Sequence, residues 1–187
     1  MNIFERINKD KKTEKKIVKP FVLWFTGLPS SGKTTIAGEV YKFLKEKKYK
    51  VERFDGDAIR AIFPSTGVDR EERNNHIKRI GYLASLLERN GVIVVCSFIS
   101  PYEESRKFVR ELCNNFVEVY VSTPLEICEE RDNKGLYKKA RSGELHSFTG
   151  VNDPYEIPEN PNINIDTRNM SIEESFSRVK DFTSKYF

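Results

Sequence analysis

The strongest sign of chemistry in the sequence is residues 27–34, which fit the spacing G-x-x-x-x-G-K-[ST] of a phosphate-binding loop. Its glycines allow tight turns that point backbone N–H groups at a β-phosphate, while the lysine can reach a γ-phosphate and the hydroxyl can hold Mg²⁺. An apolar run precedes the segment and a helical pattern follows it, which argues against a glycine-rich turn without a ligand. The sequence therefore predicts ATP and Mg²⁺ as cofactors, bound by Gly27, Leu28, Pro29, Ser30, Ser31, Gly32, Lys33, Thr34 and Thr35.

A second group with chemical potential is Asp55-Gly56-Asp57, which follows a short apolar segment. P-loop ATPases usually have a magnesium-organising acid at the end of an apolar strand, but the apolar run at 92–96 is followed by Ser97. The aspartate pair can replace that acid: one carboxylate can position Mg²⁺ and the other can accept the proton of an attacking hydroxyl. A hydroxyl acceptor indicates a kinase, whereas the alternative is a solvated turn. The predicted metal ligands are Thr34, Asp55 and Asp57.

Two arginines can bind anionic groups of the acceptor substrate. Arg60 lies one helical turn beyond Asp57, and Arg73 lies at the start of a long helical pattern. For each of them a surface salt bridge is the alternative role, and such a bridge contributes little energy.

Residues 132–141 place several cations on a short predicted helix flanked by Gly135 and Gly143. Glycines at both ends suit a lid that closes over a triphosphate and excludes water, and a solvated helix face is the alternative. Phe148 follows in a polar setting without an evident core partner, so its ring can stack on a nucleobase.

The elements that must position these residues alternate between short apolar runs and helical patterns. Strands are expected at 21–25, 51–54, 92–96, 117–121 and 163–165, and helices at about 33–47, 70–89 and 103–113, from about 124, and from 171. The run at 92–96 is apolar without alternation, which predicts a central strand buried on both faces. The pattern predicts an α/β fold with a doubly wound, mostly parallel sheet, helices on both faces and a helical lid. The ends of the first three strands should then converge.

Composition limits the remaining possibilities. The chain has 187 residues, with 32 Lys and Arg against 28 Asp and Glu, but residues 1–19 hold seven of the basic and three of the acidic ones. We therefore expect a basic, flexible arm at 1–19 and a single, charge-balanced domain at 20–187, with no nucleic-acid partner. No signal peptide or membrane-length apolar run is present, so we expect a cytoplasmic protein without a membrane partner. Three cysteines without metal-ligand spacing predict neither zinc nor a disulfide.

Residues 21–167 resemble the adenylylsulfate kinase family of P-loop nucleotide kinases. The resemblance is carried by the motifs at 27–34, 55–57, 97–102, 131–141, 148–150 and 153–156. It implies transfer of the γ-phosphoryl group of ATP to the ribose 3′-hydroxyl of adenosine 5′-phosphosulfate, a step of sulfate assimilation, by a possible homodimer. It also implies that Asp57, Lys33 and Ser100 are catalytic, that Lys134 belongs to the lid, and that the acceptor nucleotide is bound by Asp57, Arg60, Arg73, Ile99, Ser100, Lys134 and Phe148.

The serine that matches Ser100 has been assigned in this family as a phosphoenzyme intermediate. Nothing nearby in the sequence is an obvious base for Ser100, and in-line transfer between two bound nucleotides needs no covalent step. We therefore expect Ser100 to bind the anionic group of the acceptor.

The sequence departs from the family pattern on the acceptor side. Ala58 replaces an asparagine, Val68 replaces a phenylalanine, and His76 replaces an asparagine that follows the helix arginine by three residues. Because an aromatic contributes roughly 1–3 kcal/mol per stacked base, another acceptor is an alternative, such as cytidine diphosphoramidate in capsule modification. A P-loop ATPase that acts as a switch is the alternative from another class.

Overall fold

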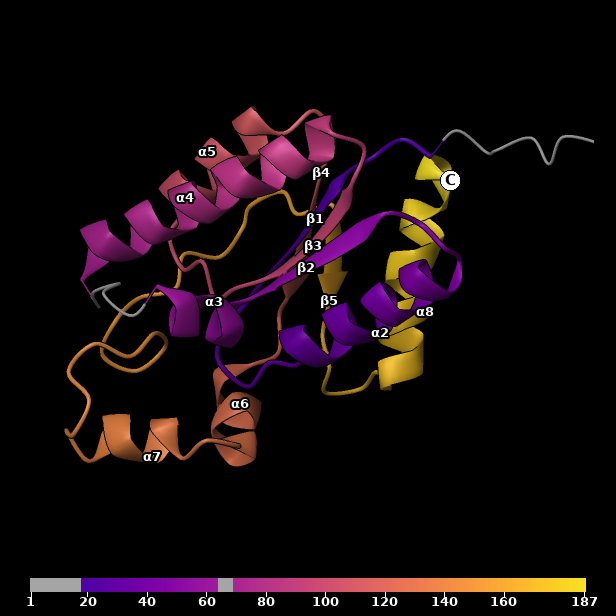
Figure 1. Cartoon of the computed structure of the whole chain (residues 1–187). Helices are drawn as coiled ribbons and strands as arrows, with labels where there is room; N and C mark the ends of the chain where they lie inside the picture. Colours follow the sequence, from indigo (N-terminus) through magenta and orange to yellow (C-terminus); the bar gives the residue numbers. More distant parts are fainter. Residues whose placement is uncertain (1–17, 64–68) are drawn as a thin grey trace, which may run out of the picture.

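In the computed structural model, which describes residues 18–63 and 69–187, the strands form one parallel five-stranded sheet in the order β2-β3-β1-β4-β5 (Figure 1). The strands are β1 (Val22–Thr26), β2 (Val51–Asp55), β3 (Ile93–Ser97), β4 (Phe116–Val121) and β5 (Ile163–Ile165). All five expected strands and the doubly wound fold are confirmed. The run at 92–96 belongs to an inner strand, β3, while the middle strand is β1.

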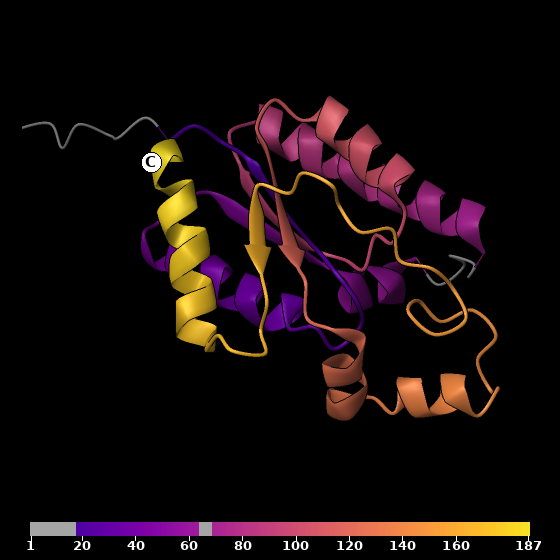
Figure 2. The same cartoon turned by 180° about the vertical axis from the view of Figure 1, so that it is seen from behind.

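Helices cover both faces of the sheet (Figures 1 and 2). One face is covered by α2 (Lys33–Glu46) and α8 (Ile172–Thr183), and the other by α4 (Arg70–Arg89) and α5 (Glu103–Leu112). Three shorter helices lie toward the carboxyl ends of the strands: α3 (Gly56–Ile62), α6 (Leu125–Arg131) and α7 (Leu136–Arg141). The 3₁₀ turn η1 (Ser184–Tyr186) follows α8.

The inner strands are buried because successive side chains enter different cores. In β1, Leu23 and Phe25 pack in the cluster under α2 and α8, whereas Val22 and Trp24 pack in the cluster under α4 and α5. Successive residues of a strand point to opposite faces of the sheet, so a strand covered on both faces must be apolar throughout. This pattern explains the continuous apolar runs of the sequence.

The expected arm at 1–19 lies almost entirely outside the described residues. Just before β1, the N–H of Lys19 donates to the carbonyl of Tyr186 at 2.9 Å. Among the described residues, no helix is long and apolar enough to cross a bilayer, and the cysteines Cys96, Cys113 and Cys128 are free thiols.

Candidate active site

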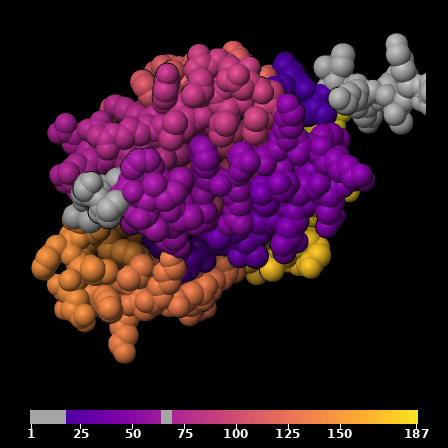
Figure 3. All heavy atoms as spheres, in the orientation of Figure 1, coloured from indigo at the N-terminus to yellow at the C-terminus, as the bar shows by residue number. Residues whose placement is uncertain are grey.

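A cavity of about 800 Å³ opens at the carboxyl ends of the strands. Its wall is formed by residues of the loop after β1, the start of α3, the first turns of α4, residues 97–101 at the end of β3, the segment 131–149, and the segment 167–175. Figure 3 shows the orange segment that carries α6 and α7 beside the purple part of the chain that carries α3. The three strand ends therefore converge as the sequence predicts.

The phosphate loop is held in an unusual backbone path. Positive φ angles occur at Gly27 (148°), Ser30 (60°) and Gly32 (103°), and a Cβ atom at Gly27 would lie 2.5 Å from the carbonyl oxygen of Val121. Only glycine fits that position without moving the neighbouring strand. Of the predicted loop residues, six line the cavity, namely Pro29, Ser30, Gly32, Lys33, Thr34 and Thr35, whereas Gly27, Leu28 and Ser31 lie behind its wall.

Lys33 is folded back onto the loop. Its ammonium group donates to the carbonyl of Leu28 at 2.6 Å and to the hydroxyl of Ser31 at 3.3 Å. Burial lowers the pKa of Lys33 to about 8, although Cys128 and the two nearby aspartates, Asp55 and Asp57, act in the opposite direction. A buried cation with only neutral partners is stabilised by an incoming phosphate.

Asp55 is the N-cap of α3, not part of a solvated turn. Its Oδ1 accepts from the backbone N–H of Asp57 at 3.1 Å, and its Oδ2 accepts from the hydroxyls of Thr34 at 3.1 Å and Ser97 at 2.8 Å. Partial burial raises the pKa of Asp55, but the hydrogen bonds from Ser97, Asp57 and Thr34 and the charge of Arg53 outweigh it and lower the pKa. Asp55 is therefore a fixed carboxylate.

Thr34 and Asp55 fit a magnesium site. Mg²⁺ is commonly held by one or two protein oxygens together with substrate phosphates and water, and a hydroxyl 3.1 Å from a carboxylate at a phosphate loop offers those oxygens. Across residues 18–63 and 69–187, no group of three or more His, Cys, Asp or Glu side chains is arranged to hold a metal ion. A metal here would depend on the nucleotide for its other ligands.

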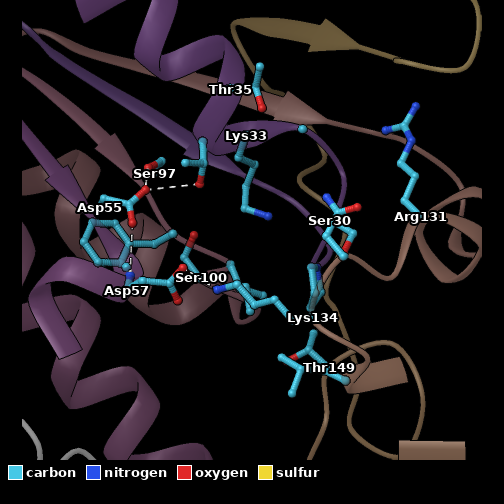
Figure 4. Close-up of a pocket in the computed structure, with 18 of the residues that line it drawn as sticks. Ser30, Lys33, Thr35, Asp55, Asp57, Ser97, Ser100, Arg131, Lys134 and Thr149 are labelled. Atoms are coloured by element: carbon cyan, nitrogen blue, oxygen red, sulfur yellow. Dashed lines mark hydrogen bonds and ion pairs between the residues drawn. The ribbon is translucent and has the colours of Figure 1, made fainter. Parts of the chain in front are cut away.

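The Asp57 side chain contacts neither of the other two predicted metal ligands, Thr34 and Asp55. Its carboxylate forms an ion pair with the ammonium group of Lys134, and both side chains are largely exposed. Figure 4 shows Asp55, Asp57 and Ser97 on one side of the cavity, Ser30 and Arg131 on the other, and Lys33 between them. The predicted set is thus divided: Thr34 and Asp55 lie together, while Asp57 faces the lid.

Ser100 is buried in the wall of the cavity. Its hydroxyl donates to Thr26 Oγ1 at 3.0 Å and accepts from Trp24 Nε1 at 3.1 Å, and its φ angle is 39°. Within the described chain, neither a carboxylate nor an imidazole hydrogen-bonds to this hydroxyl. The neighbouring carbonyl of Ile99 accepts from the Thr26 hydroxyl at 2.8 Å, which ties the segment to β1.

Arg60 and Arg73 both line the cavity, but their partners differ. Arg60 forms no ion pair or side-chain hydrogen bond with the residues that the structure describes, and burial and the charge of Arg73 lower its pKa. Arg73 forms an ion pair with Asp153 at 2.6 Å and donates to Thr149 Oγ1 at 2.7 Å and to the carbonyl of Ser147 at 2.5 Å. The predicted alternative of a surface salt bridge does not apply to Arg73, because its side chain is only 12% exposed.

Phe148 has core partners, contrary to the sequence prediction. Its ring packs edge-on against Tyr137 with the ring centres 4.9 Å apart, in a small cluster with Cys128 and Ala140. The sequence misleads here because these partners lie on α6 and α7. The polar segment around Phe148 has no apolar periodicity that would predict packing against those helices. The ring still lines the cavity.

The lid segment presents only part of its charge to the cavity. Arg131 and Lys134 line it, whereas Lys138, Lys139 and Arg141 are exposed to solvent outside it. Gly135 (φ 65°) and Gly143 (φ 83°) bracket α7 as predicted. The segment contacts the phosphate loop through the hydroxyl of Tyr137, which donates to the carbonyl of Pro29 at 3.0 Å.

His76 is the departure from the family pattern that the structure makes most informative. The residue is 6% exposed, lines the cavity, and has no hydrogen-bond partner for Nε2 among the described residues. Burial, followed by the charges of Arg60 and Arg79, lowers its pKa, so the ring is neutral near pH 7. Ala58 is exposed on α3, and Val68 lies outside the described residues.

Several site residues were not predicted. Ser97 holds Asp55, and Thr167 lies two residues beyond β5, where its hydroxyl donates to the carbonyl of Ser31 at 3.2 Å and accepts from Arg131 at 2.8 Å. Ser97 and Thr167 share a sequence feature that predicts their role: each is a hydroxyl residue at the carboxyl end of a parallel strand. Thr149 and Asp153 carry no comparable signal, because they lie in a loop.

Comparisons with known proteins agree with this geometry. The family model described as adenylylsulphate kinase matches residues 19–166. The adenylyl-sulfate kinase of Halothermothrix orenii is 49% identical over 165 residues, which cover 88% of this chain and 89% of that protein. The probable adenylyl-sulfate kinase of Aeropyrum pernix is 51% identical over 170 residues, which cover 88% of this chain and 93% of that protein.

A solved structure is similar over the same region. The Mycobacterium tuberculosis APS kinase, solved in complex with AMPPNP and APS, superposes with a TM-score of 0.85 and 36% sequence identity, over 89% of this chain and 99% of that one. The sequence resemblance is thereby confirmed, and the chain belongs to the adenylylsulfate kinase family.

Proposed function

We propose that this chain transfers the γ-phosphoryl group of ATP to the ribose 3′-hydroxyl of adenosine 5′-phosphosulfate, with Mg²⁺ as the metal. The observation that carries the proposal is the position of two carboxylates at one cavity. Asp55 is fixed beside the phosphate loop by Thr34 and Ser97, and Asp57 lies two residues further on, at the entrance to the acceptor side. Names and bound nucleotides of the related kinases support the same substrates.

Phosphoryl transfer requires charge neutralisation and alignment more than covalent chemistry. Lys33 is placed to leave the Leu28 carbonyl and bind the γ-phosphate, since its present partners are neutral. Thr34 and Asp55 would hold Mg²⁺, which supplies positive charge to the phosphates when bound. Asp57 then accepts the proton of the 3′-hydroxyl once Lys134 has released its carboxylate.

Ser100 takes part in binding rather than in a covalent step. Its hydroxyl accepts a hydrogen bond from Trp24 and donates one to Thr26, and neither partner is a base that could deprotonate it. Arg60 forms no ion pair with the described residues and can bind the anionic group of the acceptor, with Ile99 and Phe148 in the same wall.

Acceptor assays test the proposal. Purified protein with MgATP is supplied with adenosine 5′-phosphosulfate, with cytidine diphosphoramidate, or with no acceptor, and the products are identified by mass spectrometry. The expected product is 3′-phosphoadenosine 5′-phosphosulfate, which the names of the relatives favour over the two alternatives. Preference for the cytidine compound would overturn the choice of acceptor, and hydrolysis that no acceptor stimulates would overturn the kinase activity.

Two further predictions from the sequence remain proposals. A homodimer is expected from the family resemblance, and light scattering of the purified chain would establish its mass in solution. A cytoplasmic location is expected from the sequence, and fractionation of the native cells would test it.

A further inference from the structure

We propose that Asp153 is a positioning residue that sets the width of the acceptor side of the cavity. Its carboxylate contacts Arg73 on α4 and Tyr102, the N-cap residue of α5, and Asp153 lies in the loop that carries Phe148. The inference rests on the proposed function, because it concerns the half of the cavity assigned to the acceptor.

Arg73 is the first link. It lies in the first turn of α4, and two of its guanidinium nitrogens are used by the loop at residues 147–153. These contacts join a long, rigid helix to a loop without regular secondary structure. Because the Asp153 side chain is only 20% exposed, the ion pair is screened less by water than a surface pair.

Tyr102 is the second link. It is the N-cap residue of α5, is 1% exposed, and donates its hydroxyl to both oxygens of Asp153 at 3.1 Å. Only Pro101 separates Tyr102 from Ser100. The same carboxylate therefore connects the wall that contains Ser100 with the wall that contains Phe148.

The loop is also fixed from within. The N–H of Gly150 donates to the carbonyl of Asp153 at 2.8 Å, and the N–H of Asp153 donates to the carbonyl of Phe148 at 3.2 Å. A Cβ atom at Gly150 would lie 2.9 Å from the side chain of Leu28, so the loop rests against the phosphate loop. The loop has little freedom to shift unless its contacts to Arg73 and Tyr102 are lost.

Asp153 and Tyr102 lie behind the wall, since neither lines the cavity, whereas Arg73, Ser100, Phe148 and Thr149 do line it. Asp153 also balances the charge of Arg73, whereas Arg60 forms no ion pair with the described residues. The carboxylate thus acts on the acceptor through other residues. It fixes the positions of Arg73 and of the loop at residues 147–153.

The test compares Asp153→Asn with the wild type and with Glu104→Gln. Glu104 also links α4 and α5, through Lys78 and Asn74, but it does not line the cavity and makes no ion pair or side-chain hydrogen bond with residues 147–153. It is therefore a matched control for the loss of a helix-linking carboxylate. Asp153→Asn is expected to raise KM for adenosine 5′-phosphosulfate by about ten- to a hundredfold, since charged hydrogen bonds are the stronger class. KM for ATP should change less than about twofold, and Glu104→Gln should leave both constants unchanged.

Three additional experiments separate positioning from simple destabilisation. Asp153→Glu restores the charge and should recover part of the acceptor affinity. Hydrogen exchange of residues 147–152 should be faster in Asp153→Asn than in Glu104→Gln, at a temperature where both variants are folded. Tyr102→Phe removes only the second link and should give a smaller increase in KM.

An unchanged acceptor KM in Asp153→Asn, with wild-type exchange in the loop, would overturn the inference while leaving the proposed function in place. If the wild type phosphorylates another nucleotide instead, the proposed function fails, and the same comparison is made with that nucleotide. If the wild type phosphorylates no acceptor, the exchange measurement alone decides: equal rates in both variants would overturn the inference.

Discussion

The nucleotide side and the acceptor side of the cavity are built by different means. The phosphate loop of the nucleotide side is one continuous segment, in which glycine backbone geometry and short contacts such as Lys33 to Leu28 fix the shape. The acceptor side is assembled from four separate segments that are joined by charged side chains, such as Arg73 with Asp153 and Lys134 with Asp57. A site fixed by the backbone tolerates side-chain changes around it, whereas a site fixed by ion pairs can alter its specificity through single substitutions.

This contrast agrees with where the sequence departs from the family pattern. The phosphate-binding motif is intact, whereas Ala58, Val68 and His76 all belong to the acceptor side in the sequence. The difference between the two sides can be tested by substitutions and conditions that should affect only one of them.

The largest expected effect is that of Asp57→Asn. The amide keeps the size of the side chain but cannot accept the proton of the hydroxyl, so kcat should fall by about 10²–10⁴-fold. ATP affinity, measured by calorimetry, should change little, because the hydroxyl of Thr34 in the phosphate loop contacts Asp55, whereas the ion-pair partner of Asp57 is Lys134. Substantial turnover in this variant would show that Asp57 is not the base.

The second effect is confined to the nucleotide side and comes from Lys33. Its pKa is about 8 in the free protein, and bound phosphates raise the pKa, so below pH 8 the lysine is protonated in both states and affinity does not depend on its titration. Above pH 8 binding must take up a proton, and ATP affinity should fall by up to about tenfold per pH unit. Calorimetry at pH 8.5 in two buffers of different ionisation enthalpy measures the uptake. Affinity that stays constant to pH 9.5 would contradict a lowered pKa.

The third effect belongs to the acceptor side. His76→Leu fills the site with an apolar group and removes the unpaired Nε2. If this atom hydrogen-bonds to the acceptor, the substitution should cost about 1–1.5 kcal/mol, or about tenfold in acceptor KM. KM for ATP should not change. His76→Asn introduces the residue of the family pattern, and its ratio of activities toward the adenosine and cytidine acceptors shows whether His76 controls specificity. Equal changes in both KM values would mean that the substitution damages the cavity as a whole.

The smallest effect is expected from Lys134→Ala. Its ion pair with Asp57 is largely exposed, and such pairs contribute less than about 1 kcal/mol to stability, so the melting temperature should hardly move. Acceptor KM should rise by only about two- to fivefold. Lys138→Ala is the matched control, since Lys138 lies in the same segment but outside the cavity. An equal effect of both substitutions would attribute the change to the general charge of the segment.

The sequence was sufficient to predict elements with strong periodicity. The bounds of α4 coincide with the predicted 70–89, and each expected strand is present within one or two residues. The short helix α3 is harder to predict, because seven residues that begin with glycine have little intrinsic helix preference and Asp55 also suits a turn. The helix forms because the Asp55 side chain caps it while bound to Thr34 and Ser97.

The acceptor side was predicted less well than the nucleotide side for a physical reason. A phosphate loop is a local structure, so its residues are neighbours in the sequence. Arg73 and Asp153 are 80 positions apart, and their pairing depends on how an irregular loop folds back onto two helices. Phe148 was misjudged on the same ground, because its partner Tyr137 lies on a separate short helix.

The hydrogen bond from Trp24 to Ser100 makes the protein its own optical reporter. Trp24 is the single tryptophan of the chain, is fully buried, and stacks on Phe98 with the ring centres 5.4 Å apart. Phe98 and Ser100 both line the cavity, so the indole emission should respond more strongly to a ligand at that wall than to one at the phosphate loop. Fluorescence of the unlabelled chain should therefore distinguish acceptor binding from ATP binding within a single titration.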